Sequence, residues 1–172
     1  MRCEAVKFWD KIKNEFALKS YDIVDYNNPL VYVGMMIGKI KRNDKVWYTI
    51  DQTSELVDFL HDKQMMNVRH VSAPMPYKNE MYSDDTLLSM QQHEEYRSMV
   101  GSLVYFALLR YDIAHDVSRL SAVVSKPTKG AMKALNRVMA YLASTVDKQL
   151  LVCRVNGNTW HINSHSDHAG DK

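Results

Sequence analysis

The sequence predicts an α+β protein that is rich in helix, and two patterns carry that prediction. Between Tyr96 and Leu151, apolar residues recur every three or four positions in three successive segments, which is the period of helices packed on one side. Before and after this stretch, residues 30–50 and 150–163 have the pattern of short strands separated by turn residues. We therefore expect a three-helix bundle with one β-hairpin ahead of it and a second β-hairpin at the carboxyl end.

Ahead of the bundle, the chain predicts a helix and then a hairpin. The helix covers about residues 3–17. Residues 30–40 predict one strand, in which Gly34 favours a simple bulge. Residues 42–44 then turn the chain into a second strand at residues 46–50. The apolar stripe of the first helix consists of Ala5, Phe8, Trp9, Ile12 and Phe16.

A further helix is expected at residues 53–63, with Thr53 or Ser54 near its cap. Residues 67–89 contain prolines and polar residues without sustained periodicity, so they predict a loop or linker. In the bundle, Asp112 is placed to cap the second helix and Thr128 to cap the third. The three apolar seams are Met99, Val100, Leu103, Val104 and Ala107; Ile113, Val117, Leu120 and Val124; and Ala131, Leu135, Val138 and Leu142.

Charge is distributed unevenly along the chain. The net charge of +2 combines a balance of −3 over residues 1–95 with +5 over residues 96–149. Cations spaced along the third helix form what we call the basic ridge, which suits a polyanionic partner. A solvated helix face is the commoner explanation of such a pattern. The basic ridge consists of Lys126, Lys129, Lys133 and Arg137.

Composition excludes several classes of protein. No run of about 18 apolar residues exists to span a membrane, and the amino-terminal segment lacks the apolar centre of a signal peptide. Cys3 and Cys153 are too few for a disulfide framework or a four-cysteine zinc site. We therefore expect an intracellular protein, cytoplasmic or nuclear, without a membrane partner.

The carboxyl-terminal tail gathers residues that can ligate divalent metals, but their spacing matches no closed zinc module. We expect no native metal site there. The chain also lacks the phosphate-binding loop, the nucleophile elbow and the zinc-protease helix motif. The tail residues in question are His161, His165, Asp167, His168 and Asp171.

Several segments, taken in order, resemble the Pol polyprotein of copia-type retrotransposons in the region that follows the reverse transcriptase active site. The central block is the most specific part of this resemblance, and the first 30 residues match only loosely. The matching segments are residues 96–107, 110–121 and 125–142, Thr145 with Asp147, and residues 169–172, preceded by Val33-Gly34, Gln52 and residues 73–76.

The resemblance implies roles for particular residues. Val33 and Gly34 match the primer grip, where backbone near a glycine holds the primer end. Gly101 and Tyr105 match the positions of the thumb helix that face the minor groove of the template–primer duplex. The basic ridge would meet phosphates or face the linker to ribonuclease H. The implied partners are an RNA/DNA template–primer duplex and the upstream palm and fingers of the polyprotein.

The resemblance also implies an organisation and its limits. The family enzyme is an RNA-directed DNA polymerase with ribonuclease H, active in virus-like particles and dependent on magnesium. The polymerase motif Y-V-D-D is absent from this chain, and His165 occupies the place of the first ribonuclease H aspartate. We therefore expect an inactive fragment without a cofactor of its own. Its implied parts are the end of the palm at residues 1–66, a linker at 67–92, thumb and connection helices at 93–149 and a truncated start of ribonuclease H at 150–172.

Three alternatives stay open from the sequence. The chain could be a non-enzymatic helical module that binds a protein, or a degenerate transposon remnant. It could also be a metal-dependent nuclease that uses the histidine and aspartate tail, in which Asp167 would be essential.

Overall fold

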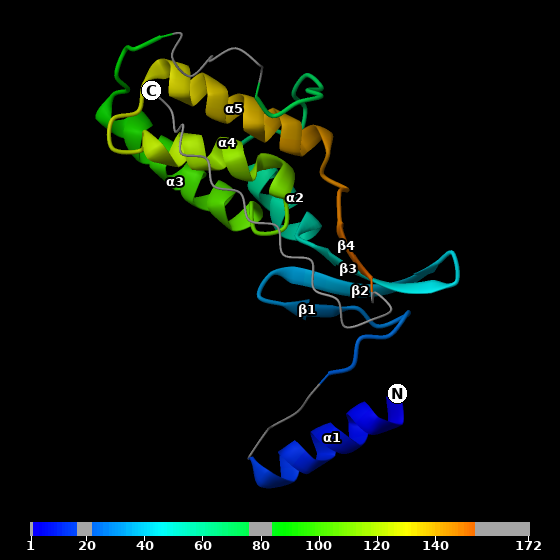
Figure 1. The fold of residues 1–172 in the computed structure, drawn as a ribbon. Helices are drawn as coiled ribbons and strands as arrows, with labels where there is room; N and C mark the ends of the chain where they lie inside the picture. The colour runs from blue at the N-terminus through cyan, green and yellow to red at the C-terminus, as the bar shows by residue number, and fades with distance from the viewer. Residues whose placement is uncertain (1, 17–21, 76–83, 154–172) are drawn as a thin grey trace, which may run out of the picture.

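The computed structural model describes residues 2–16, 22–75 and 84–153, which form helices and one antiparallel sheet (Figure 1). The predicted α+β class is confirmed. In chain order the elements are α1 (Arg2–Glu15), β1 (Leu30–Tyr32), β2 (Met35–Arg42), β3 (Lys45–Asp51), α2 (Thr53–Asp62), α3 (Met90–Phe106), α4 (Tyr111–Ala122), α5 (Lys129–Ser144) and β4 (Leu150–Cys153).

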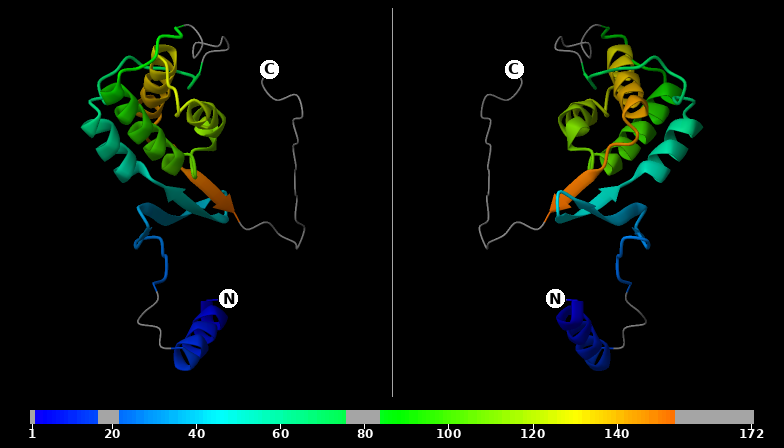
Figure 2. Two further views of the ribbon diagram at one scale, coloured as in Figure 1. Left: turned by 90° about the vertical axis from the view of Figure 1, so that its left-hand side faces the viewer. Right: turned by 90° about the vertical axis from the view of Figure 1, so that its right-hand side faces the viewer.

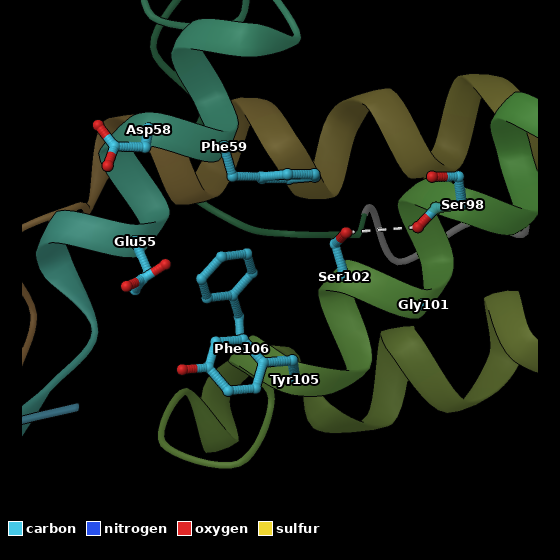
Figure 3. Close-up of a pocket in the computed structure, with 8 residues that line it drawn as sticks. All are labelled: Glu55, Asp58, Phe59, Ser98, Gly101, Ser102, Tyr105 and Phe106. Carbon is cyan, nitrogen blue, oxygen red and sulfur yellow. Dashed lines mark hydrogen bonds between the residues drawn. The ribbon is translucent and has the colours of Figure 1, made fainter. Parts of the chain in front are cut away.

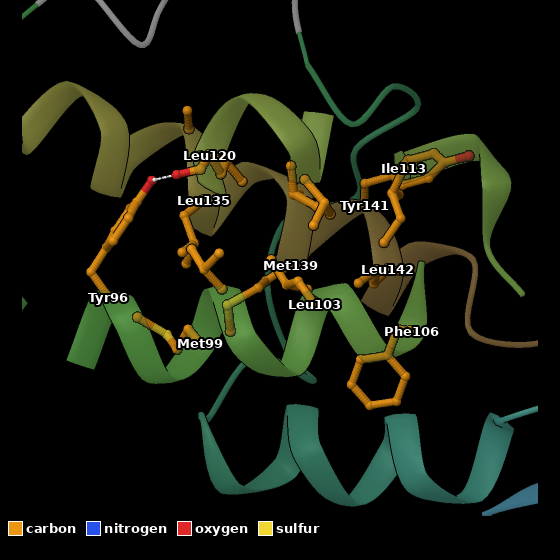
Figure 4. Packing of buried hydrophobic residues seen from close by; sticks show 14 of the residues in the cluster. Tyr96, Met99, Leu103, Phe106, Ile113, Leu120, Leu135, Met139, Tyr141 and Leu142 are labelled. Carbon is orange, nitrogen blue, oxygen red and sulfur yellow. Dashed lines mark hydrogen bonds between the residues drawn. The ribbon is translucent and has the colours of Figure 1, made fainter. Parts of the chain in front are cut away.

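The core lies among the helices α2 to α5 (Figure 4). Most residues of the three predicted apolar seams are buried in it, so the helical periodicity is confirmed; Val104 is an exception, with 49% of its surface exposed. Helix α2 adds Leu56 and Leu60 to the same core, so the bundle contains a fourth helix that the prediction had placed with the hairpin. Burial of these side chains is the main force that holds the helices together.

Two helix starts are stabilised by their own side chains. The hydroxyl of Thr128 accepts from the amide of Ala131, which confirms the predicted cap of α5. Helix α3 begins at Met90, ahead of the predicted bundle, because Ser89 and Gln92 form a reciprocal capping box. The sequence carried this signal as serine followed three positions later by glutamine.

The predicted cap at Asp112 is wrong. Asp112 lies inside the first turn of α4 and its carboxylate accepts hydrogen bonds from Arg110, so it does not cap the helix. The expectation that Thr53 lies near the cap of α2 is confirmed, because the helix begins at Thr53 and its cap residue is Gln52. The amide of Thr53 donates to Oδ1 of Asp51 at 3.1 Å.

The predicted strand at residues 30–40 is two strands joined by a tight turn. Tyr32 pairs with Met35, so Val33 and Gly34 alone form the connection between β1 and β2. Their φ angles are 50° and 71°, the positive values that a type I′ hairpin turn needs at both positions. The bulge favoured for Gly34 is therefore wrong. The second hairpin, between β2 and β3, confirms the predicted reversal at residues 42–44.

Val33 is strained, because a β-branched side chain crowds the backbone at positive φ. We expect Val33→Asn to raise the free energy of unfolding by about 1 kcal/mol, since asparagine tolerates this conformation and favours type I′ turns. The Val33 side chain is 66% exposed, so little burial is lost. Urea denaturation measures the change. Val31→Asn, at a strand position 67% exposed, is the control, and an equal gain there would contradict the explanation.

Strand β4 comes from the far end of the described chain and pairs with β3, which gives the sheet order β1-β2-β3-β4. The second strand of the predicted carboxyl-terminal hairpin lies outside the described residues. Side views show the helical core on one side of the sheet and α1 on the other (Figure 2). Helix α1 exposes Phe8 and Trp9, and Phe16, which directly follows the helix, is exposed as well. In residues 2–16, 22–75 and 84–153, none of the helices has the length and hydrophobicity that a bilayer span requires.

Candidate nucleic-acid interface

The turn between β1 and β2 is held directly on helix α3. The hydroxyl of Tyr105 donates a hydrogen bond of 2.9 Å to the carbonyl oxygen of Val33, 72 residues away in sequence. Gln52 also contacts this end of α3, since its Nε2 donates to the Tyr105 carbonyl at 3.3 Å. The predicted grip turn and one of the two predicted groove-facing residues thus lie together.

Gly34 has no room for a side chain. A Cβ atom built on it would overlap the Tyr105 hydroxyl and lie 3.2 Å from Cγ of Glu55. Its φ of 71° would strain any other residue as well. The resemblance explains this glycine by the approach of a sugar and phosphate. In the structure, its missing side chain leaves space for Tyr105.

Gly101 borders a cleft of about 540 Å³ between α2 and α3 (Figure 3). Both aromatic and polar side chains line the cleft, and they include two carboxylates of α2, Glu55 and Asp58. A Cβ atom at Gly101 would meet nothing within 4 Å, so this face of α3 is open. The described lining residues are Glu55, Asp58, Phe59, Ser98, Gly101, Ser102, Tyr105 and Phe106.

The outer line of α3 beside Gly101 carries few charges. Arg97 is exposed one turn before Gly101, and Val104 follows with 49% of its surface exposed. Leu108, just after the helix, is 54% exposed. The carboxylates of the cleft repel phosphates, whereas this outer line can approach sugars and base edges without a charge penalty.

The basic ridge is only partly as predicted. Lys126, Lys129 and Lys133 are exposed, but Arg137 is half-buried and its Nε has no hydrogen-bond partner within the described part of the chain. Hydrogen bonds from Thr86 hold the pKa of Asp84 below its usual range, and the nearby Lys129 and Lys133 lower it further.

The structure separates the start of the basic ridge from the Val33–Gly34 turn. The amide of Lys129 donates to the Thr86 carbonyl, so the ridge begins beside the segment that leads into α3. Tyr105 lies at the other end of α3, about 24 Å from the start of the ridge at about 1.5 Å per residue, and the ridge runs along α5 toward that end. One ligand that contacts both must therefore be extended, as a nucleic-acid duplex is.

A polar network around the buried Arg110, which sequence reasoning missed, joins α4, α5 and the segment before β4. Arg110 is 6% exposed and donates to both carboxylate oxygens of Asp112 at 3.0 and 2.9 Å. It also donates to the carbonyl and hydroxyl oxygens of Thr145 at 2.9 and 2.7 Å. Tyr141 and Lys148 donate to the same aspartate. The network fixes the path by which the chain leaves α5 and enters β4.

In the described residues, no group of three or more histidine, cysteine, aspartate or glutamate side chains is arranged to hold a metal ion. The histidine and aspartate tail lies outside that part of the chain.

The fold and the candidate site define an α+β protein in which a tight β-turn is docked on the end of a helix. Its sequence is related to retrovirus-related Pol polyproteins of transposons, and the predicted resemblance to the copia type is confirmed. No family model matches the chain, and no solved structure matches it.

The relatives are plant polyproteins much longer than this chain. It is 30% identical over 165 residues to the Pol polyprotein from transposon RE1 of Arabidopsis thaliana, covering 95% of this chain and 10% of that protein. It is 29% identical over 165 residues to the polyprotein from transposon RE2 of the same plant, covering 94% and 10%. It is 28% identical over 141 residues to the polyprotein from transposon TNT 1-94 of Nicotiana tabacum, covering 78% and 10%. The chain therefore spans about a tenth of the length of these relatives.

Proposed function

We propose that this chain is the part of a retrotransposon RNA-directed DNA polymerase polyprotein that holds the template–primer duplex, without the carboxylates that catalyse nucleotide addition. The observation that carries the proposal is the hydrogen bond from Tyr105 to Val33. It joins the turn at the primer-grip position to the helix at the thumb position, so that one duplex can contact both.

Recognition would depend on the shape of the duplex rather than its sequence. Gly101 lets the helix approach closely, and the exposed Val104 and Leu108 can pack on sugars of a minor groove. Contacts of this kind fix the register of a duplex and carry little sequence information. Glu55 and Asp58 would keep phosphates away from the cleft and direct the backbone to either side of it.

Phosphate binding falls to the exposed part of the basic ridge. Lys126, Lys129 and Lys133 extend into solvent, whereas the half-buried Arg137 contributes less. The start of the ridge and the turn are about one helix length apart, which a duplex of several base pairs can span.

Polymerisation would require the rest of the polyprotein. The Y-V-D-D carboxylates and their magnesium ions would come from an upstream palm, because this sequence does not contain that motif. The sheet leaves Val31, Tyr32, Met36 and Ile40 between 38% and 67% exposed. An upstream palm and fingers would cover these apolar side chains. The palm and fingers are therefore the partner that we propose for this surface.

The salt dependence of binding to an RNA–DNA hybrid tests the proposal. If three lysines contact phosphates, the logarithm of the association constant should fall with the logarithm of salt concentration at a slope of about −3. Lys129→Ala/Lys133→Ala should make that slope shallower by about 2. Fluorescence anisotropy at several salt concentrations measures it.

The matched control is Lys41→Ala/Lys45→Ala, which removes two exposed lysines from the β2–β3 hairpin. This variant should keep the slope of the unaltered protein. An unchanged slope in the ridge variant would refute the phosphate role. Absence of binding at low salt would refute duplex recognition altogether.

A non-enzymatic interaction module is the second candidate. The observation that favours it is the amphipathic helix α1, in which Phe8 and Trp9 are 59% and 42% exposed, followed directly by Phe16 at 62%. An apolar face of this kind on a helix can bind a protein groove. If the Lys129→Ala/Lys133→Ala variant loses duplex binding although its α1 is unaltered, this candidate does not explain the loss.

A further inference from the structure

The aromatic side chain at position 105 is held in place before any ligand arrives. Its backbone carbonyl accepts from Gln52, a side chain only 6% exposed. Its ring lies 5.4 Å from that of Phe106, centroid to centroid, and Phe106 in turn lies 5.4 Å from Phe59 of α2. The hydroxyl of Tyr105 is therefore presented at a defined point beyond the edge of the core.

The turn is built to receive that hydroxyl. The carbonyl of Val33 accepts the hydrogen bond of the Tyr105 hydroxyl at 2.9 Å. The oxygen of that hydroxyl also fills the space where a side chain of Gly34 would stand. Val33 keeps its strained φ of 50° within this contact. The two residues are thus complementary, because Gly34 lacks the Cβ atom that would overlap the Tyr105 hydroxyl.

We propose that Tyr105 is a positioning residue that locks the Val33–Gly34 turn against α3, and that position 34 is a glycine because this hydroxyl occupies its side-chain space. The consequence for binding rests on the proposed function. A hydroxyl that donates to Val33 is committed within the protein, so Tyr105 acts on a duplex through the turn. The affinity for a duplex with a recessed 3′ end, which reaches the turn, depends on the contact between Tyr105 and the turn. The affinity for a blunt duplex held along α3 does not depend on it.

The lock itself is testable without nucleic acid, by a double-mutant cycle on folding stability. Gly34→Ala should lower the folding equilibrium constant, because alanine is strained at this φ and overlaps the tyrosine hydroxyl. In a Tyr105→Phe background the overlap is gone, so the same substitution should cost about tenfold less in that constant. Urea denaturation of the four proteins gives the coupling.

The control uses another tyrosine of the same helix. The hydroxyl of Tyr96 donates to the Leu120 carbonyl at 2.9 Å, away from the turn. Tyr96→Phe should therefore be additive with Gly34→Ala. Additive effects of Gly34→Ala and Tyr105→Phe would overturn the proposed lock.

The consequence for binding is measured with two hybrids of equal length, one blunt and one with a recessed 3′ end. Tyr105→Phe should weaken binding of the recessed hybrid about fivefold, the effect of one lost hydrogen bond, and leave the blunt hybrid unchanged. Tyr96→Phe should not alter the ratio of the two affinities. Folding coupling together with an unaltered ratio would overturn the role in positioning. If the unaltered protein binds neither hybrid, the proposed function fails while the folding cycle still decides whether the lock exists.

Discussion

Arg110→Met is expected to lower the free energy of unfolding by about 3 kcal/mol, because it removes the hydrogen bonds of a buried guanidinium to a carboxylate. Arg110 is 6% exposed and makes four hydrogen bonds, two to Asp112 and two to Thr145. Methionine keeps much of the side-chain volume but leaves the Asp112 carboxylate without its main cation. The Asp112 side chain is 31% exposed, which lets water offset part of the loss.

Urea denaturation measures this change, and Arg97→Met is its control. Arg97 is exposed on α3, so its replacement should alter the free energy of unfolding by less than about 0.5 kcal/mol. A similar loss in both variants would mean that the Arg110 network does not stabilise the fold.

Acid provides a second measurement of the same network. Burial raises the pKa of Asp112, but hydrogen bonds from Arg110 and Tyr141 outweigh burial and hold that pKa well below its usual range. Its contribution to stability is therefore complete above the ordinary aspartate pKa of about 4 and is lost as the pH falls toward the folded-state value. We expect Asp112→Asn to be less stable at neutral pH and to lose less stability between pH values of about 4 and 2.

Leu103→Ala is expected to cost about 3 kcal/mol, because it removes three buried carbons and leaves a cavity in the helical core. Leu103 is fully buried at 0% exposure. It lies in the same cluster as Leu120 and Leu135, on the side of α3 that faces α4 and α5 (Figure 4). The midpoint of thermal or urea unfolding measures the effect.

Leu108→Ala is the matched control for this prediction. Leu108 lies five residues further along and is 54% exposed, so the same change of atoms should cost less than about 1 kcal/mol. If Leu108→Ala were as damaging as Leu103→Ala, the apolar core would not lie where the structure has it.

The helices could be predicted from sequence because the signals that form them are local. Apolar residues three or four positions apart identify the buried side of α3, α4 and α5, and Thr128 lies next to the amide that it caps. The predicted cap at Asp112 was wrong because its carboxylate accepts hydrogen bonds from Arg110 instead of from the helix amides. The network behind that choice joins residues 35 positions apart, for which a single sequence has no periodic signal.

The sheet and the candidate site were predictable only in part. The turn between β1 and β2 could not be predicted, because it contains Val33, and valine favours strands and rarely adopts positive φ. The resemblance drew attention to Val33, Gly34, Gly101 and Tyr105 but gave no reason to expect that Tyr105 contacts the turn. That contact depends on how a hairpin and a helix pack in three dimensions.

The position of β4 has a consequence for how this chain acquires its structure. The edge of β3 is completed by residues that follow α5, so one ladder of the sheet joins segments about 100 positions apart. Contacts of such high sequence separation slow folding, since the loop between them must be closed first. On the ribosome, the two hairpins emerge well before their last strand and present an open edge during that interval. The helical bundle, whose contacts are closer in sequence, is the part expected to form first and to bring β4 to its neighbour.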